Sequence, residues 1–235
     1  EIMSIKAIIT GSTGMVGEGV LHESLKHPDI ESVLVINRSS CGVEHPKLTE
    51  IIHSDFSDFS TIESKLSGYN AAFLCMGITS LGISEEKYSA ITHDMTLALA
   101  TPLAKLNPEM TLCYVSGLGT DSTESGRNMW VRVKGRTEND LLKLPLKQSY
   151  MFRPGYIQPT PGLKNTYTAY KVLNYISPVL RKLFPKYVSS LEEIGLAMIQ
   201  VVKEGAENRH VEVLDIVALA NTQLNKGKSR DKMDN

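Results

Sequence analysis

TGSTGMVG, residues 10–17, carries three glycines at intervals of three residues, at Gly11, Gly14 and Gly17. The apolar run IKAIIT directly before it (residues 5–10) has the length and the β-branched residues of a buried strand. After it, residues 14–27 are expected to form a helix that Pro28 stops. A strand, a glycine turn and a helix in this order predict the first unit of a doubly wound α/β fold.

The same alternation of short apolar runs and helical segments continues along the chain and predicts a parallel sheet with helices on both faces. Strands are expected at residues 5–10, 33–37, 50–53, 71–76, 111–116, 149–153 and 210–214. Helices are expected at residues 14–27, 60–66, 85–106 (kinked at Pro102), 129–144, 190–203 and 215–221. We therefore expect one Rossmann-type domain over residues 3–222, with a small C-terminal cap at 156–190. The polar residues 223–235 are expected to form a disordered tail.

The charge balance, the cysteines and the histidines indicate which binding partners, cellular compartment and metal sites to expect. The 25 Lys and Arg residues nearly cancel the 26 Asp and Glu residues, which gives no case for a nucleic acid or an anionic membrane as main partner. No apolar run reaches the roughly 18 residues of a membrane-spanning helix. Three cysteines without a CxxC pair predict free thiols and a cytoplasmic protein. The six histidines show no metal-ligand spacing, so no metal site is expected.

The glycine turn has the chemistry of a phosphate site. Its glycines permit a close approach of the backbone to a pyrophosphate, and the start of the following helix offers unpaired N–H groups and a positive dipole end. The alternative is a turn that needs glycine for packing alone. The nucleotide interpretation predicts that the dinucleotide pyrophosphate lies against Gly11, Ser12, Thr13, Gly14, Met15, Val16 and Gly17.

The end of the second strand indicates which dinucleotide is preferred. A site that prefers NAD usually carries an Asp or Glu there, which binds the ribose hydroxyls. This chain has Asn37 and Arg38 instead. An arginine can fork onto a 2′-phosphate, so NADP(H) is predicted as the preferred cofactor and NAD(H) as the second possibility. The alternative is an ordinary surface arginine.

Two further positions extend the predicted cofactor site. Asp55 follows the third strand, where its carboxylate could reach the adenine amino group while Phe56 covers the ring. A cap on the next helix explains Asp55 equally well. Gly77 follows the fourth strand and would let the backbone pass close to the cofactor, although a plain turn is an alternative.

Taken together, these segments resemble the atypical short-chain dehydrogenase/reductases. The shared motifs are the TGxxGxxG turn, Asp55, CMG (75–77), VSGLGTDS (115–122), VKGRTEN (133–139) and FRPG (152–155), within a similarity that runs from Ile5 to about residue 220. The resemblance is to the NAD(P)H-binding branch that includes Tat-interacting-protein-like reductases and bacterial epimerase/dehydratase-like proteins. The helices after the fourth and fifth strands pair in dimeric relatives, so the resemblance allows a homodimer.

The resemblance implies a catalytic set with one departure from the family pattern. Ser116 falls where the family's serine polarises a substrate carbonyl, and Lys134 where its lysine lowers the pKa of a tyrosine and binds the nicotinamide ribose. The tyrosine position, four residues before Lys134, holds Trp130, whose indole has no useful acid pKa. Tyr156 after FRPG is the candidate substitute. Pro154 and Gly155 of that segment are expected to lie at the cofactor.

Two functional classes follow from this pattern. In the first, the protein is an NADPH-dependent oxidoreductase or epimerase-like enzyme that acts on an unknown small molecule. In the second, it binds the dinucleotide without turnover, as a redox sensor or a partner-binding module. Trp130 favours the second class, whereas Ser116, Lys134 and the Arg-Pro-Gly segment favour the first. The sequence therefore leaves open whether the protein is an enzyme.

Overall fold

A computed structural model describes residues 4–166 and 177–231 of the protein. Its main sheet contains β1 (Ile5–Thr10), β2 (Ile30–Asn37), β3 (Leu48–Ile52), β4 (Ala71–Leu74), β5 (Thr111–Val115), β6 (Gln148–Arg153) and β9 (His210–Glu212). The strand order is β3-β2-β1-β4-β5-β6-β9, and every neighbouring pair is parallel. This arrangement confirms the predicted Rossmann-type fold and its sheet of seven strands.

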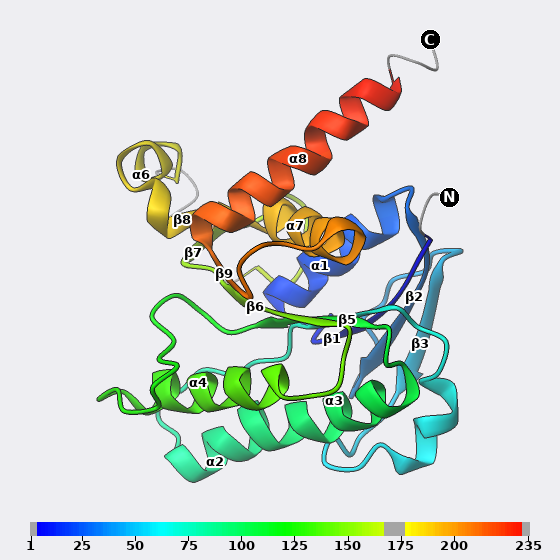
Figure 1. Ribbon diagram of the computed structural model, residues 1–235, viewed down its shortest axis with the longest axis vertical. Coiled ribbons are helices and arrows are strands. Elements are labelled where there is room, and N and C mark those ends of the chain that lie inside the picture. The colour runs from blue at the N-terminus through cyan, green and yellow to red at the C-terminus, as the bar shows by residue number, and fades with distance from the viewer. Residues whose placement is uncertain (1–3, 167–176, 232–235) are drawn as a thin grey trace.

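Helices cover both faces of the sheet. One face carries α1 (Met15–Lys26), α7 (Leu191–Glu204) and α8 (Val213–Asp231); the other carries α2 (Glu85–Ser89), α3 (Met95–Leu106) and α4 (Met129–Leu142) (Figure 1). Side chains alternate along each strand, so Ile9 packs in the cluster with α1 and α7 while Ile8 packs in the cluster with α3. Because both faces are covered, β1 is an almost uninterrupted apolar run, as the sequence indicated.

The strand order reverses between β1 and β4. In open α/β sheets the crevice at such a reversal, beyond the carboxyl ends of the strands, is where ligands bind. Thr10, the last residue of β1, pairs with Leu74, the last residue of β4, so the two strands end side by side. The glycine turn and α1 follow β1 directly. The fold therefore places the turn at the reversal point.

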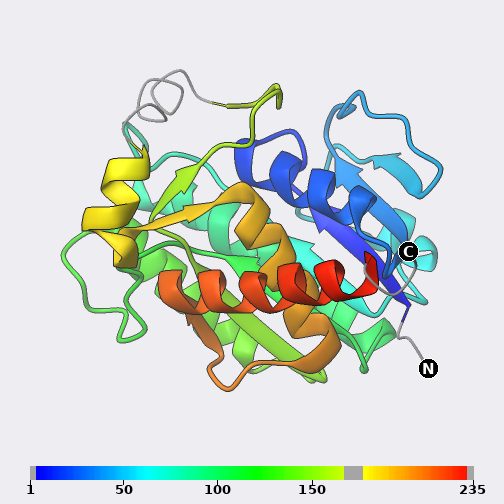
Figure 2. The same ribbon diagram turned by 90° about the horizontal axis from the view of Figure 1, so that it is seen from above.

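The region expected to form a cap contains a second, two-stranded sheet. It consists of β7 (Tyr156–Gln158) and β8 (Val188–Ser190), with α6 (Ser177–Leu183) and a 3₁₀ turn (Pro185–Tyr187) between them. In Figure 2, α6, drawn in yellow, stands at the edge of the molecule. Residues 167–176 lie outside the described part of the chain. A substrate-side cap at 156–190 stays a prediction.

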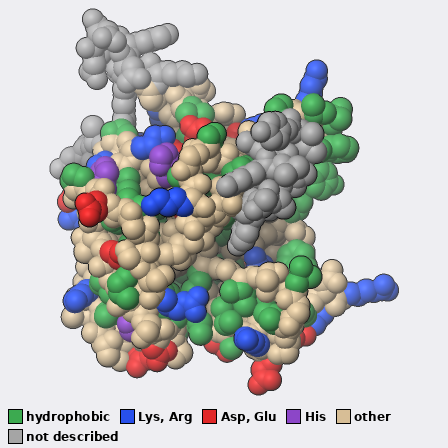
Figure 3. Space-filling model, turned by 180° about the vertical axis from the view of Figure 1, so that it is seen from behind, with side chains coloured by type: hydrophobic (Ala, Val, Ile, Leu, Met, Phe, Trp, Pro, Cys, Tyr) green, Lys and Arg blue, Asp and Glu red, His purple; other side chains and the backbone are tan. Residues whose placement is uncertain are grey.

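The surface mixes the two signs of charge. On the face drawn in Figure 3, basic and acidic side chains are interspersed rather than gathered into one field. Within the described residues, none of the helices combines the length and the apolar character needed to cross a membrane. The same part of the chain contains no cluster of three or more His, Cys, Asp or Glu side chains able to hold a metal ion.

Helix geometry between the fourth and fifth strands differs from the expectation. The sequence predicted one helix over 85–106 with a kink at Pro102, but the structure inserts a π-helical turn at Ala90–Asp94 between α2 and α3. The N–H of Met95 bonds to the carbonyl of Ala90, five residues earlier. Pro102 lies inside α3. The apolar period of the segment could not reveal this change of hydrogen-bond register.

The C-terminal tail was also predicted incorrectly. Residues 223–231 belong to α8, where a disordered tail was expected over 223–235; residues 232–235 lie outside the described part. The polar composition of this segment suggested disorder, but two of its polar side chains contact α7. The buried Gln223 donates to Gln200 of α7 (2.7 Å), and Lys226 forms an ion pair with Glu204 of the same helix. These contacts stabilise a helix that the sequence alone does not favour.

Candidate cofactor-binding and catalytic site

Two of the three glycines of the turn have no room for a side chain. Gly11 has a φ of +76°, and a Cβ on it would lie 2.6 Å from the carbonyl oxygen of Cys75. A Cβ on Gly17 would lie 2.0 Å from the carbonyl oxygen of Gly11. By contrast, a Cβ on Gly14 would meet its nearest atom at 3.4 Å. The fold itself therefore requires glycine at positions 11 and 17, but not at 14.

A pocket of about 220 Å³ opens beside this turn. It is lined by Gly11, Thr13, Gly14, Ile36, Asn37, Arg38, Phe56, Cys75, Met76 and Gly77. These residues come from the turn, the end of β2, the segment after β3 and the end of β4. The sequence predicted a dinucleotide site from the same four places. Ile36, Asn37, Cys75 and Met76 were missed as site residues, although each lies within two residues of Arg38 or Gly77.

Other residues of the turn have different surroundings. The Ser12 hydroxyl is buried and donates to Oδ1 of Asn37 (2.9 Å). Met15 is buried in the core, and Val16 packs against the same cluster. Only the backbone of these residues remains available for a phosphate. The start of α1 lies at the pocket because Thr13 and Gly14 line it.

Asp55 does not line the pocket, in contrast to the prediction. Its Oδ1 accepts hydrogen bonds from the backbone N–H (2.9 Å) and the hydroxyl (2.5 Å) of Ser57. These hydrogen bonds lower the pKa of its carboxyl group. Asp55 thus stabilises a turn, and at the 3₁₀ helix that follows (Ser60–Lys65) it is Asp58 whose carboxylate accepts from the backbone N–H of Ser60. A local turn explains Asp55 without a cofactor.

Lys134 and Trp130, both on α4, face the loop that follows β5. The Lys134 ammonium donates to the carbonyl oxygen of Ser116. A Cβ on Gly117 would lie 3.9 Å from Nζ of Lys134 and 3.9 Å from the Trp130 ring, and one on Gly119 would also lie 3.9 Å from that ring. Lysine and indole therefore border the same loop, at the carboxyl edge of the sheet.

Burial sets the acidity of Lys134. Desolvation of the ammonium lowers the pKa of Lys134 to about 8, and the negative charge of Glu138, one helical turn away, opposes part of this shift. At neutral pH the ammonium form still predominates. An amine with a pKa near 8 can hold or exchange a proton at Nζ under ordinary conditions.

This pKa can be measured directly. In reductively ¹³C-methylated protein, the Lys134 NMR signal should titrate near pH 8, and Lys134→Arg identifies it by its absence. Glu138→Gln should move that pKa lower, because a carboxylate that favours the ammonium is removed. Since folding lowers this pKa from its ordinary 10.5, stability should rise as the pH increases from about 8 towards 10.5. Titration of Lys134 above pH 10 would contradict the buried environment.

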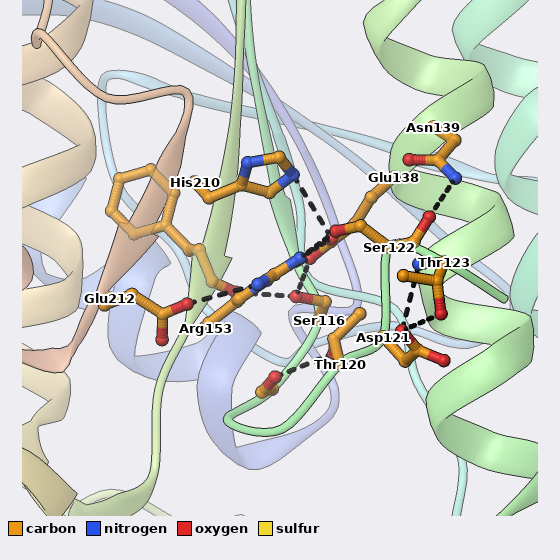
Figure 4. Close-up of polar contacts among 12 residues, drawn as sticks. Ser116, Thr120, Asp121, Ser122, Thr123, Glu138, Asn139, Arg153, His210 and Glu212 are labelled. Carbon is orange, nitrogen blue, oxygen red and sulfur yellow. Dashed lines mark hydrogen bonds and ion pairs between the residues drawn. The ribbon is translucent and has the colours of Figure 1, made fainter. Parts of the chain in front are cut away.

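Ser116 does not take the orientation expected of a catalytic serine. Its side chain is 4% exposed, and its Oγ lies 2.5 Å from Oε1 of Glu138 and 3.2 Å from the carbonyl oxygen of Phe152, so it donates into the protein interior. Figure 4 shows this hydroxyl pointing into the cluster around Glu138. The prediction that Ser116 polarises a substrate carbonyl disagrees with this geometry. The backbone carbonyl of Ser116, and not its hydroxyl, is the group that contacts Lys134.

Arg153 and Glu138 form the centre of a buried ionic cluster that sequence reasoning missed. Glu138 is fully buried, and Arg153 reaches it through Nε (3.0 Å) and through a second nitrogen (2.5 Å). The guanidinium also donates to Ser122 (2.7 Å) and Glu212 (3.2 Å), as Figure 4 shows. The cluster therefore ties the loop after β5 to α4, β6 and β9. The sequence signal that could have indicated this cluster is Arg153 itself, a charged residue at the end of the buried strand β6.

The Pro154–Tyr156 segment connects the main sheet to the two-stranded sheet. The carbonyl of Pro154 accepts from the N–H of Leu118 (2.9 Å). A Cβ on Gly155 would lie 2.5 Å from the carbonyl oxygen of Tyr187, so packing already explains this glycine. Tyr156 begins β7 and pairs with Val188. The cofactor contacts predicted for Pro154 and Gly155 and the catalytic role predicted for Tyr156 stay predictions.

Comparison with curated proteins gives distant relatives. A scan against models of protein families matches none. "Protein FMP52, mitochondrial" of Meyerozyma guilliermondii is 23% identical over 225 residues, which cover 94% of each chain. The protein of the same name from Saccharomyces cerevisiae is 26% identical over 154 residues, covering 64% of this chain and 65% of the relative.

These names contradict the predicted cytoplasmic location. Both relatives are named mitochondrial, as is the FMP52 protein of Candida glabrata, which is 26% identical over 211 residues. The prediction was wrong because it depended on unpaired cysteines. Free thiols argue against an oxidising compartment, but they do not distinguish one reducing compartment from another.

Solved structures share the architecture at low sequence identity. The ADP-L-glycero-D-manno-heptose-6-epimerase of Helicobacter pylori superposes with a TM-score of 0.65 at 15% identity, over 94% of this chain and 82% of the other. A short chain dehydrogenase family protein of Francisella tularensis gives 0.61 at 15% identity, over 88% and 95%. The Bordetella bronchiseptica enzyme WbmF in complex with NAD⁺ and UDP gives 0.61 at 14% identity, over 95% and 78%. The resemblance to short-chain dehydrogenase/reductases is thus confirmed at the level of the fold, a Rossmann-type sheet shared with dehydrogenases and sugar epimerases.

Proposed function

We propose that the protein binds NADP(H) in the pocket beside the glycine turn and uses it as an oxidoreductase or epimerase-like enzyme on a small molecule. The observation that carries the proposal is the pocket itself. It joins Gly11 and Gly14 at the start of α1, Arg38 after β2 and Gly77 after β4, at the point where the strand order reverses.

The residues of the pocket fit a dinucleotide chemically. The N-terminus of α1 favours the negative charge of a pyrophosphate, and the missing side chain of Gly14 leaves room for its approach. Arg38 offers a planar fork of donors for a 2′-phosphate. A Cβ added to Gly77 would have no atom within 4 Å, so open space lies beside the backbone at this position. NAD⁺ in the WbmF complex supports NAD(H) as the second cofactor.

Lys134 is proposed to act at the nicotinamide end. Gly117 follows β5 as Gly77 follows the neighbouring β4, so the loop bordered by Lys134 continues the same edge of the sheet. A bound nicotinamide supplies or accepts the hydride. The Lys134 ammonium can orient a ribose or an oxyanion by donating to it. Trp130 can donate a hydrogen bond but cannot transfer a proton, so Tyr156 is the candidate for that step.

One observation favours the alternative of a dinucleotide-binding protein without turnover. The Trp130 ring lies against Gly117 and Gly119, beside Lys134. This is the position at which related enzymes carry their tyrosine, and an indole there provides bulk without acidity. The same pocket would then serve a redox sensor or a partner-binding module.

Two measurements test these functions. Calorimetry with NADPH, NADP⁺, NADH and NAD⁺ should show binding, and NADPH oxidation should then appear with some member of a panel of aldehydes, ketones and quinones. Lys134→Ala should lower that rate by about 10²-fold or more, whereas Lys105→Ala, an exposed lysine on α3, should leave it unchanged. Trp130→Tyr should create or raise carbonyl reduction.

The outcomes separate the two classes. An absence of heat with all four nucleotides, on folded protein, would refute dinucleotide binding. Tight binding without turnover on any substrate, in the wild-type protein and in Trp130→Tyr, would support the non-catalytic function.

A further inference from the structure

A chain of hydrogen bonds connects the glycine turn to the segment that follows β2. The Ser12 hydroxyl, in the turn, donates to Oδ1 of Asn37 at 2.9 Å. The Asn37 amide nitrogen in turn donates to Oε1 of Glu50 at 2.9 Å. Ser12 and Asn37 are both almost fully buried, so their hydrogen bonds are shielded from competing water. Glu50 belongs to β3, the strand adjacent to β2.

Glu50 also holds the residues on the other side of Arg38. Its Oε2 accepts from the Ser40 hydroxyl at 2.7 Å, and its Oε1 accepts from the backbone N–H of Cys41 at 2.9 Å. Partial burial acts to raise the pKa of Glu50, but the hydrogen bonds from Ser40, Cys41 and Asn37 outweigh it, so its pKa lies below the usual value. The carboxylate is therefore ionised at neutral pH and engaged by donors of its own chain.

Arg38 lies between these two attachments. Asn37 before it and Ser40 and Cys41 after it are all bound to the same carboxylate, which restricts the short loop that carries Arg38. Arg38 lines the pocket and is exposed. Among the described residues, no side chain forms a hydrogen bond or ion pair with its guanidinium. The loop is thus fixed, while the charged group remains available to a ligand.

We propose that Glu50 is a specificity-determining residue that holds the Arg38 loop in position to bind the 2′-phosphate, and so sets a preference for NADP(H) over NAD(H). This inference rests on the proposed dinucleotide function. The simplest interpretation of a carboxylate near the end of β2 is the opposite one. Such a carboxylate would repel the 2′-phosphate of NADP(H) and so select NAD(H). Repulsion is not expected to dominate, because both oxygens of Glu50 are already engaged by donors of its own chain, whereas the Arg38 guanidinium remains available to the phosphate.

Affinities for NADPH and NADH, measured by calorimetry on Glu50 and Arg38 variants, test the proposal. Glu50→Ala should weaken NADPH binding about 10-fold, the effect of roughly one well-placed hydrogen-bonded contact, and change NADH binding less than about threefold. Glu50→Gln keeps an acceptor oxygen for Asn37 and Cys41, so it should give a smaller loss in the same direction. Adding Glu50→Ala to Arg38→Ala should not reduce the NADPH preference further, because both act through one guanidinium.

A matched control is Glu31→Ala. Glu31 lies on β2 at the opposite end of the strand, where it likewise accepts from a serine hydroxyl, that of Ser4 (2.6 Å). This variant should leave both affinities unchanged. An increase in NADPH affinity in Glu50→Gln or Glu50→Ala would show that repulsion dominates and would overturn the proposal. An unchanged NADPH-to-NADH ratio would overturn it while the proposed function stands, whereas a wild-type protein that binds neither nucleotide would overturn both.

Discussion

Gly17→Ala is expected to destabilise the protein severely. The new Cβ would lie 2.0 Å from the carbonyl oxygen and 2.3 Å from the carbonyl carbon of Gly11, both backbone atoms that cannot rotate away. Relief requires α1 to move off the end of β1, where Val20 and Leu21 are packed in the core. We expect a loss of about 3 kcal/mol or more in the free energy of unfolding, at the upper end of overpacking effects. Urea unfolding followed by circular dichroism measures this loss.

Gly14→Ala provides the matched control for that experiment. Its Cβ would stay 3.4 Å from its nearest neighbour, and Gly14 has an ordinary φ of −105°, so its free energy of unfolding should change by less than about 1 kcal/mol. The methyl group would nevertheless project where the pocket lining is now bare. NADPH binding should therefore fall about 10-fold or more while the fold persists. Equal stability of Gly17→Ala and the wild type would show that the turn is looser than the structure indicates.

Glu138→Ala is expected to cost about 3–5 kcal/mol, because it leaves the Arg153 guanidinium buried without its main partner. The Glu138 side chain is fully buried and that of Arg153 is 12% exposed, so water cannot replace the lost carboxylate. The Ser116 hydroxyl loses its acceptor at the same time. Urea unfolding of the variant at neutral pH gives the loss directly.

An exposed ion pair in the same protein sets the scale for comparison. Lys6 and Glu31 form a pair at 3.2 Å with side chains about half exposed, so Glu31→Ala should change the free energy of unfolding far less than Glu138→Ala does. Replacing both buried partners, as in Glu138→Leu with Arg153→Met, should cost less than the sum of the single changes, because no charge is then left unpaired. A loss below about 1 kcal/mol in Glu138→Ala would mean that the cluster is hydrated.

Local sequence signals predicted their elements well where the cause is local. The helix expected from residue 190 begins there as α7, at a capping box whose partners lie within one turn: Ser190 Oγ accepts from the Glu193 N–H at 3.1 Å, and Glu193 accepts from the Ser190 N–H at 2.8 Å. Asp55 illustrates the limit of such signals. Its position after a strand suited a cofactor contact, but its side chain bonds to Ser57, two residues away.

The order of residues along the chain was enough to predict the Rossmann-type sheet, the glycine turn and the start of α1. Apolar periodicity and the backbone freedom of glycine depend on residues that are close along the chain, so their physical consequences can be derived without a structure. Three other features depend on the packed fold: the contact of Glu50 with Asn37, the orientation of the Ser116 hydroxyl toward Glu138, and the continuation of α8 through residue 231. The partners of these groups lie from 13 to 23 residues away in sequence, as with Gln223 and Gln200. Which donor meets which acceptor is therefore set by the packing of strands and helices, and no local pattern carries that information.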